Sequence, residues 1–430
     1  MKSKIAAAAF VLAMFCPAQP APASDWPQYR GPSGDDTSPE KLMLKKWPES
    51  GPKALWHTAL TDGFSAFAVK EGKAYTLVSR DIEAVKREVC VAIDADTGKE
   101  LWSFPLGIAK YEGGGDSGTP DNKGGDGPRS TPSVDGNRVY VMSGQLHLYC
   151  LDAATGHEVW SVDLLKEHHG RNIGWENAAS PLIEGNLVLV AGGGEGEGLL
   201  AFDKGSGKVV WKGQDDKMTQ STPTAATIEG VRQVVFFTQK GLVAVAPATG
   251  DVLWRFPFRY SVSTAISPVI GGNMVYCSNG YGVGAAVAKI TKDGDGFHAT
   301  ELWKVNAKTL NSHWSTPVYK AGYLYGLFGF KEYGNCPLKC VEMATGKVMW
   351  SQDGFGPGGV ILVDGQLLVL GDKGQLVLAA ASTDGYVENA RCIALTGKCW
   401  NRAVVANGHI YARSTTEGVC LDVTGKTASR

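Results

Sequence analysis

Polar and aromatic side chains that could bind a ligand stand directly before a recurring Ser-Pro or Ser-Thr-Pro step in this chain. The residues upstream of the step change from copy to copy, and with a weaker last copy they comprise Arg129, Trp175, Glu176, Asn177, Gln220, Thr264, His313, Trp314 and Arg402. Guanidinium, carboxamide and imidazole groups can hydrogen-bond a ligand, and indole rings can stack on one. We expect ligand specificity where residues vary on a repeated frame, so this set is our candidate site.

Each candidate also has a purely structural interpretation. Glu176 and Asn177 offer the carboxylate and amide oxygens that calcium prefers. Adjacent residues on an extended strand point to opposite faces, however, so both would bind one ion only if the backbone bulges there. His313 could be a base or a hydrogen-bonded structural histidine, and Trp314 could be a stacking platform or could close a channel by packing. Arg129 could face a ligand or could hold the Gly/Asp-rich stretch that precedes it.

A repeated motif indicates the elements that must position these residues. In the copy at 152–160, which reads DAATGHEVW, an acidic residue lies eight positions before a tryptophan and a glycine lies four before it. Copies with the same spacing end at Trp102, Trp211, Trp254 and Trp350. Alternating apolar residues before the acid are typical of a strand, the acid can accept backbone N–H bonds in the turn, and glycine supplies a positive φ. We expect each tryptophan to lie on an outer strand and to pack against the neighbouring unit.

Counting the copies predicts the fold. Degenerate copies add Trp303 and Trp400, and the C-terminal copy ends without a tryptophan, which Trp56 near the other end can supply. The eight tryptophans follow one another at intervals of 43 to 58 residues, which suits one four-stranded unit each. Each unit also contains a hairpin glycine flanked by alternating apolar residues, namely Gly72, Gly136, Gly185, Gly230, Gly272, Gly322, Gly365 and Gly408. We predict an all-β fold, a single eight-bladed β-propeller of four-stranded blades whose ring is closed by an N-terminal strand. In such a fold the candidate residues precede the innermost strands and line one mouth of the central channel.

The motif resembles the repeat of pyrroloquinoline-quinone (PQQ) type β-propellers. That family includes quinoprotein dehydrogenases, polyvinyl-alcohol-dehydrogenase-like exported propellers and the non-catalytic propeller subunit of the outer-membrane β-barrel assembly machinery. The resemblance covers about Trp47 to Gly425, and the lead segment from Trp26 to Pro32 is similar to the opening of many exported bacterial propellers. The resemblance implies the fold and leaves the activity open, because one fold hosts many functions.

The N-terminus predicts export. Lys2 and Lys4 precede an apolar run from Ile5 to Phe15 and then small residues, a pattern typical of a cleaved secretory signal. The run is too short to cross a bilayer, and no later stretch approaches the required length. We therefore expect a periplasmic or secreted chain without a transmembrane segment, organised as a signal peptide (1–24), a lead segment (25–50) and a propeller (51–430). The bulky residue before Cys16 argues against a lipoprotein. The net charge of −1 gives no basic footprint for nucleic acid.

Three functions remain open. We predict a monomeric, non-catalytic binding or scaffold protein that holds a protein segment or extracellular ligand at the channel mouth and uses no cofactor. The alternative, which the resemblance implies, is a PQQ- and calcium-dependent alcohol dehydrogenase. Many such enzymes carry two adjacent cysteines over the cofactor, and this chain has no Cys-Cys step. A carbohydrate binder would account for the aromatic and amide residues. Cys392 and Cys399 could form a disulfide across a turn, whereas Cys150, Cys340 and Cys420 are expected to be buried thiols.

Overall fold

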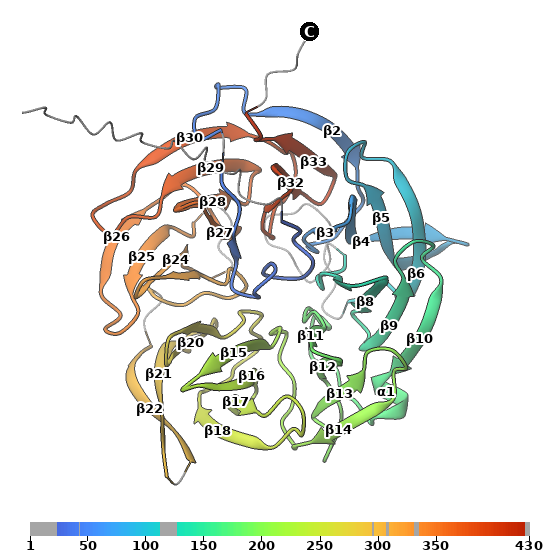
Figure 1. Ribbon diagram of the computed structural model, residues 1–430, viewed down its shortest axis with the longest axis vertical. Coiled ribbons are helices and arrows are strands. Elements are labelled where there is room, and N and C mark those ends of the chain that lie inside the picture. The colour runs from blue at the N-terminus through green and yellow to red at the C-terminus, as the bar shows by residue number, and fades with distance from the viewer. Residues whose placement is uncertain are drawn as a thin grey trace, which may run out of the picture.

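The computed structural model describes residues 24–42, 44–111, 127–294, 296–306, 309–330 and 335–425. These residues form eight sheets arranged as blades around a ring, each with four antiparallel strands (Figure 1). The predicted eight-bladed, all-β propeller is therefore confirmed. The predicted signal peptide and Cys16 lie outside the described residues. Within the described part, no helix has the length and apolar character needed to cross a membrane.

The strands of each blade follow one another along the chain, from the channel outward. Blade 1 comprises β3 (Ala68–Lys70), β4 (Lys73–Ile82), β5 (Val85–Asp94) and β6 (Glu100–Ile108). Blade 2 comprises β7 (Ser133–Asp135), β8 (Arg138–Met142), β9 (His147–Asp152) and β10 (Glu158–Asp163), followed by helix α1 (Leu164–Glu167). Blade 3 comprises β11 (Leu182–Glu184), β12 (Leu187–Ala191), β13 (Leu199–Asp203) and β14 (Val209–Gly213). Blade 4 comprises β15 (Thr224–Ile228), β16 (Val231–Thr238), β17 (Gly241–Val245) and β18 (Val252–Pro257).

The second half of the ring continues the same order. Blade 5 comprises β19 (Val269–Gly271), β20 (Met274–Asn279), β21 (Gly284–Asp293) and β22 (Gly296–Val305). Blade 6 comprises β23 (Val318–Lys320), β24 (Tyr323–Leu327), β25 (Leu338–Glu342) and β26 (Val348–Gln352). Blade 7 comprises β27 (Gly359–Val363), β28 (Gln366–Leu370), β29 (Gln375–Ala380) and β30 (Glu388–Ile393), with the short strand β1 (Thr37–Ser38) pairing in parallel with β27. Blade 8 comprises β31 (Val404–Ala406), β32 (His409–Arg413), β33 (Glu417–Asp422) and, as its outer strand, β2 (Lys53–Ala59). The antiparallel pairing of β2 with β33 places Trp56 opposite Cys420 and closes the ring as predicted.

The repeated motif locks one blade onto the next. In blade 2 the Asp152 carboxylate accepts hydrogen bonds from the backbone N–H groups of Ala154 and Thr155, both at 3.0 Å, and so fixes the turn. Gly156 in this turn has a φ of 75° and lies against the Trp102 ring of blade 1, so closely that an added Cβ would be 2.6 Å from the ring. The Trp102 indole N–H then donates to the Ala153 carbonyl at 3.1 Å.

Six of the eight predicted tryptophans make this contact with a carbonyl of the following blade, namely Trp56, Trp102, Trp160, Trp211, Trp303 and Trp350. Trp254 lies on its outer strand but donates to Gln233 in its own blade at 2.6 Å. Blade 5, onto which it packs, joins its two outer strands in a long hairpin instead of the tight motif turn.

The prediction for Trp400 is wrong. Ala390 stands opposite Leu378 in blade 7, the register at which the other outer strands carry their tryptophan. The following blade offers the Val423 carbonyl, and the backbone N–H of Leu44 donates to it at 3.3 Å. Trp47 packs against the same hydrophobic cluster, and its indole N–H donates to the Leu44 carbonyl. The lead segment thus fills the place of the missing tryptophan, which explains why Trp400 is available for another position.

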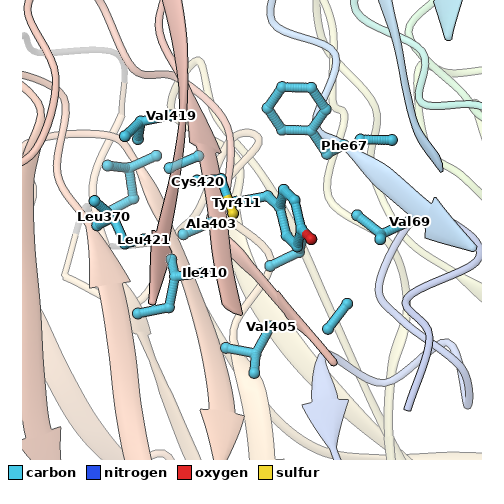
Figure 2. Packing of buried hydrophobic residues seen from close by; sticks show 14 of the residues in the cluster. Phe67, Val69, Leu370, Ala403, Val405, Ile410, Tyr411, Val419, Cys420 and Leu421 are labelled. Atoms are coloured by element: carbon cyan, nitrogen blue, oxygen red, sulfur yellow. The ribbon is translucent and has the colours of Figure 1, made fainter. Parts of the chain in front are cut away.

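Apolar side chains fill the seams between blades. Figure 2 shows the seams on either side of blade 8, where successive residues of β32 point to opposite faces. Tyr411 points toward Phe67 and Val69 of blade 1, and Ile410 lies on the side of Leu370 in blade 7. The same cluster includes Trp56 and Cys420, so the closing strand is part of a continuous core.

The lead segment crosses the centre of the ring (Figure 1) and contacts six blades through buried groups. Trp26 exchanges two backbone hydrogen bonds with Val69 of blade 1, and the Pro27 carbonyl accepts one from blade 2. Arg30 donates to Thr224 of blade 4 and to a carbonyl of blade 5. Asp36 binds Leu362 of blade 7 through its carbonyl and Arg402 of blade 8 through its carboxylate. The segment is a fixed part of the propeller that occupies its channel.

All eight cysteines in the described residues are buried free thiols. The suggested pairing of Cys392 with Cys399 is therefore absent. The two sulfurs face different neighbours, because Cys392 lies against Gly51, just ahead of β2, and Cys399 contacts the Gly397 carbonyl. Cys150, Cys340 and Cys420 are buried on separate blades, as predicted.

Candidate functional site

Residues from all eight blades and from the lead segment line one cavity, which we call the central pocket. Its lining consists of Tyr29, Phe64, Ala66, Arg129, Thr131, Trp175, Ala178, Gln220, Ser263, Ala265, Tyr281, His313, Trp314, Gly358, Trp400, Asn401 and Arg402. The centres of water-sized molecules can occupy about 130 Å³ of it, far more than the ~10–15 Å³ that a single water requires. The pocket is therefore large enough for a small ligand or an inserted side chain.

The propeller repeat explains how these residues come together. In seven blades the residue four positions before the innermost strand lines the pocket, namely Phe64, Arg129, Ala178, Gln220, Ala265, Trp314 and Trp400. The Ser-Thr-Pro step just after this position has a structural role. Thr131, for example, receives a backbone N–H bond from Ala66 of blade 1, and its own N–H donates to Ser180 of blade 3. Interblade hydrogen bonds of this kind hold the variable residues around the channel axis.

Six of the nine predicted residues line the pocket: Arg129, Trp175, Gln220, His313, Trp314 and Arg402. Glu176, Asn177 and Thr264 are absent from the lining. The Thr264 side chain is fully buried and donates to the Ser278 carbonyl at 3.0 Å. Asn177 is also buried, and its amide binds the backbone at Ser143 and Ala179. These side chains hold the backbone that presents their neighbours.

Stacked aromatic rings form one wall of the pocket. The Trp400 ring lies 5.4 Å from Phe64 at an interplanar angle of 23° and 4.7 Å from Trp314 at 32°. His313 packs edge-on against Trp314 at 4.9 Å, and its Nε2 lies 3.2 Å from the Ser263 hydroxyl. Trp400 was missed as a site residue because its spacing had been assigned to the blade motif. The sequence does contain a signal for this role, because Trp400 stands directly before Asn401 and Arg402, four residues ahead of β31.

A second aromatic pair, Trp175 and Tyr281, comes from blades 3 and 5. The two rings are nearly parallel, with centroids 6.3 Å apart, and both residues have left-handed backbones, with φ of 65° and 54°. Bulky residues rarely adopt this conformation, and such strain tends to persist at functional sites. The Trp175 carbonyl accepts a hydrogen bond from Arg129 at 2.8 Å, and Gln220 donates to the next carbonyl, that of Glu176, at 2.7 Å.

Tyr29 of the lead segment lines the central pocket and also the next cavity along the channel. Its ring lies 4.3 Å from the Arg402 guanidinium, and its hydroxyl accepts a hydrogen bond from Arg402 at 3.2 Å. Tyr29 thus stands between the two cavities. Nothing in the sequence predicted this role, because the tyrosine lies outside the repeats and 373 residues from its partner.

Asn401 is a lining residue whose side-chain polar atoms lack partners in the part of the chain that the structure describes. Its side chain is only 8% exposed, and neither Nδ2 nor Oδ1 has a hydrogen-bond partner among the described residues. A buried amide without partners is costly, at about 1–3 kcal/mol per lost group. A partner that reached these two atoms would remove this cost.

A buried carboxyl group lies behind the Arg129 wall. Glu88 accepts hydrogen bonds from the Tyr111 hydroxyl at 2.6 Å and from the Gly144 N–H at 2.8 Å. Burial raises the pKa of Glu88 above its ordinary value. Arg129 lies 4.7 Å over the Tyr111 ring. This group supports the pocket wall without lining it.

The donor set of the pocket does not fit calcium. Calcium sites use carboxylate oxygens, and no Asp or Glu is among the lining residues that the structure describes. In the described ranges no three His, Cys, Asp or Glu side chains gather closely enough to hold a metal. Asn177, one of the two predicted ligands, uses its amide oxygen to accept the Ala179 N–H. The aromatic walls could stack on a planar ring, but a calcium-dependent cofactor would lack its metal ligands.

The blade motif and this central pocket define the protein as a PQQ-type β-propeller, which confirms the resemblance seen in the sequence. The chain belongs to the family described as outer membrane protein assembly factor BamB, whose model matches residues 85–326.

Curated relatives support this assignment. The outer membrane protein assembly factor BamB of Moranella endobia (strain PCIT) is 26% identical over 301 residues, covering 68% of this chain and 60% of that protein. The match thus spans less than two thirds of the relative. Quinohemoprotein alcohol dehydrogenase ADH IIB of Pseudomonas putida is 29% identical over 125 residues, covering 28% of this chain and 17% of the enzyme.

Solved structures share the fold. BamB from Moraxella catarrhalis superposes with a TM-score of 0.58 at 15% identity, covering 88% of this chain and 99% of that chain. Quinohemoprotein alcohol dehydrogenase from Comamonas testosteroni gives a TM-score of 0.61 at 15% identity, covering 95% and 82%. An assembly factor and an enzyme thus resemble the chain about equally in architecture, so the fold does not decide its activity.

Proposed function

We propose that this protein is an exported, non-catalytic binding protein that holds a segment of a partner protein, or an extracellular ligand, in its central pocket without a cofactor. One observation carries the proposal. All eight blades and the lead segment converge on an aromatic pocket whose deep amide, that of Asn401, has no partner in the described part of the chain. Concave aromatic sites with a few convergent polar groups are the usual form of a ligand site.

The described residues of the lining include no carboxylate, which supports a binding role over a catalytic one. The Ser263 and His313 pair could otherwise suggest nucleophilic chemistry, since the two groups are 3.2 Å apart. Such a pair needs a third group that orients the imidazole, ordinarily a carboxylate. The family and the Moranella endobia relative are named for assembly of outer membrane proteins, a role that involves protein partners.

The proposal includes a cellular place and a chain organisation. Residues 1–24 act as an export signal, 25–50 form the lead segment and 51–430 form the propeller. The protein works as a monomer in the periplasm or outside the cell, without a lipid anchor. The N-terminal sequence pattern supports export, and the outer membrane role of the named relative agrees with it.

A PQQ-dependent alcohol dehydrogenase is the second candidate, because the half-buried rings of Trp175 and Trp314 could stack on a planar quinone. The Pseudomonas putida and Comamonas testosteroni enzymes agree with it. The calcium donors that this chemistry requires are missing from the described residues of the lining, so we rank it second.

Thermal unfolding in the presence of PQQ and Ca²⁺ tests the proposal. A ligand that binds the native state raises the melting temperature in proportion to the logarithm of its concentration. We expect the melting temperature to be the same with and without PQQ and Ca²⁺ together. A saturable increase that the variant Trp314→Ala abolishes would place the cofactor in the pocket and would contradict a cofactor-free role.

A further inference from the structure

We propose that the ligand of the central pocket is an exposed peptide segment that inserts one uncharged proline or aromatic side chain while Asn401 binds its backbone. This inference rests on the proposed binding function and names the class of partner. Any protein that presents such a side chain on a loop or at a terminus would supply a suitable segment.

The Asn401 amide is complementary to a peptide backbone. Its Nδ2 donates and its Oδ1 accepts, side by side on one planar group, and a peptide unit offers the complementary carbonyl and N–H. Both atoms are buried without a partner among the described residues. If this side chain turns toward the pocket, a peptide backbone would satisfy both atoms at once, and the gain is largest where water has been excluded.

The aromatic walls suit an inserted proline or aromatic ring. Trp314 and Trp175 are half-buried and line the pocket, whereas Trp400 behind them is 7% exposed. Aromatic-lined sites recognise proline-rich and aromatic segments, because rings pack on the flat faces of indoles and lose little conformational entropy. The two walls leave one cavity between them, which suits a single inserted ring.

The floor and the charges of the pocket limit which kind of segment can enter it. The lead segment crosses the centre of the ring, and its Tyr29, held by Arg402, lines both the pocket and the second cavity. The inserted element must then be the tip of a loop or a terminus. No carboxylate is among the described residues that line the pocket, so none of these would receive a Lys or Arg side chain, and an ionised group without a partner is costly to bury. Of the two arginines in the lining, Arg402 is paired with Asp36. Arg129 donates to the Trp175 carbonyl and lies over the Tyr111 ring. An uncharged tip is therefore favoured.

Titration with defined peptides tests the inference. The full mature chain is mixed with acetyl-Gly-Gly-Phe-Pro-Gly-Gly-amide or with acetyl-Gly-Gly-Ala-Ser-Gly-Gly-amide, and binding is measured by calorimetry and by tryptophan fluorescence. We expect saturable binding of the first peptide and at least about tenfold weaker binding of the second. The variant Asn401→Leu should weaken binding of the first peptide by about tenfold or more.

Two further variants make the result specific to the pocket amide. Asn137→Leu changes an exposed asparagine on the blade 2 hairpin and should leave binding unchanged. Asn401→Asp keeps the size of the side chain but removes the donor, so it should also weaken binding, and near-UV circular dichroism checks that both Asn401 variants remain folded. Equal binding of the peptide to the wild type and to both folded Asn401 variants would overturn the inference.

Failure of this inference is distinguishable from failure of the proposed function. If maltotriose binds in an Asn401-dependent manner and neither peptide does, the partner class is wrong and the binding function stands. If no peptide binds at millimolar concentration, the peptide inference is likewise wrong. If PQQ with Ca²⁺ supports alcohol oxidation, the proposed function itself is wrong.

Discussion

The Asp36 carboxylate accepts a hydrogen bond from Arg402 at 2.8 Å and so joins the lead segment to the last blade across 366 residues of sequence. The same carboxylate lies 2.7 Å from Arg30, and all three side chains are at most 4% exposed. One buried anion thus serves two buried cations. Because Arg402 also holds Tyr29, this cluster connects the stability of the ring to the shape of the central pocket.

We predict that Asp36→Asn destabilises the protein by about 3–5 kcal/mol, because removal of one partner leaves buried charges uncompensated. Guanidinium-induced unfolding measures the change. Asp364→Asn is the control, since that aspartate makes its ion pairs at the surface with exposed Lys41 and Lys45, and such pairs contribute little. Similar unfolding midpoints for the two variants would show that the buried cluster does not hold the lead segment in place.

We predict that Trp102→Ala costs about 3–5 kcal/mol of stability, since it removes a buried ring and leaves a cavity at the seam of blades 1 and 2. Leu101→Ala is the matched control, because this neighbour on β6 is 48% exposed and points outward. Its effect should stay within about 0.5 kcal/mol. Equal melting temperatures for the two variants in thermal unfolding would contradict the locking role of the motif.

Glu88 should give the stability a pH dependence opposite in sign to that of an ordinary salt-bridged acid. Burial raises its pKa in the folded state, so its contribution is fully present below the unfolded value, near ~4.3. The contribution is then lost as the pH rises toward the raised folded pKa. Gln at this position does not titrate. The melting temperature of Glu88→Gln minus that of the wild type should therefore increase as the pH rises from 4 to 8. Parallel profiles for Glu88→Gln and the wild type would contradict a raised pKa.

The thiols should be inert in the native protein. Burial raises the pKa of Cys340 and Cys392 to about 11 and that of Cys150 to about 12, and the thiolate is the reactive form. We expect negligible alkylation by iodoacetamide at pH 8 without denaturant, and modification of all eight described cysteines after unfolding without reductant. Fewer than eight modified residues would reveal a disulfide.

The sequence predicted the fold well because the repeat fixes it locally. The acid and glycine of each turn and the tryptophan of each outer strand depend on neighbours a few residues away. The same repeat placed Arg129, Gln220 and Trp314 before innermost strands, and the structure brings all three into one pocket. Periodicity along the chain was sufficient for this part of the site.

The remaining site residues depend on contacts that no local pattern records. Thr264 and Asn177 sit in the expected segments, but their side chains satisfy buried backbone groups instead of facing the pocket. Trp400 fits the tryptophan spacing approximately. Only the structure shows that Ala390 of β30 stands at the position where the other outer strands carry their tryptophan. Tyr29 enters the pocket because the lead segment folds back across the ring, which the repeats cannot predict.

The central claim is that the chain binds a partner in its pocket and catalyses no redox reaction. Dye-linked oxidation of ethanol and of polyvinyl alcohol by the purified protein, after incubation with PQQ and Ca²⁺, tests it most directly. We predict no reduction of the dye above the rate of PQQ and Ca²⁺ without protein. Dye reduction that depends on the alcohol and on both PQQ and Ca²⁺, and that is lost in Trp314→Ala, would contradict the claim and identify the protein as a dehydrogenase.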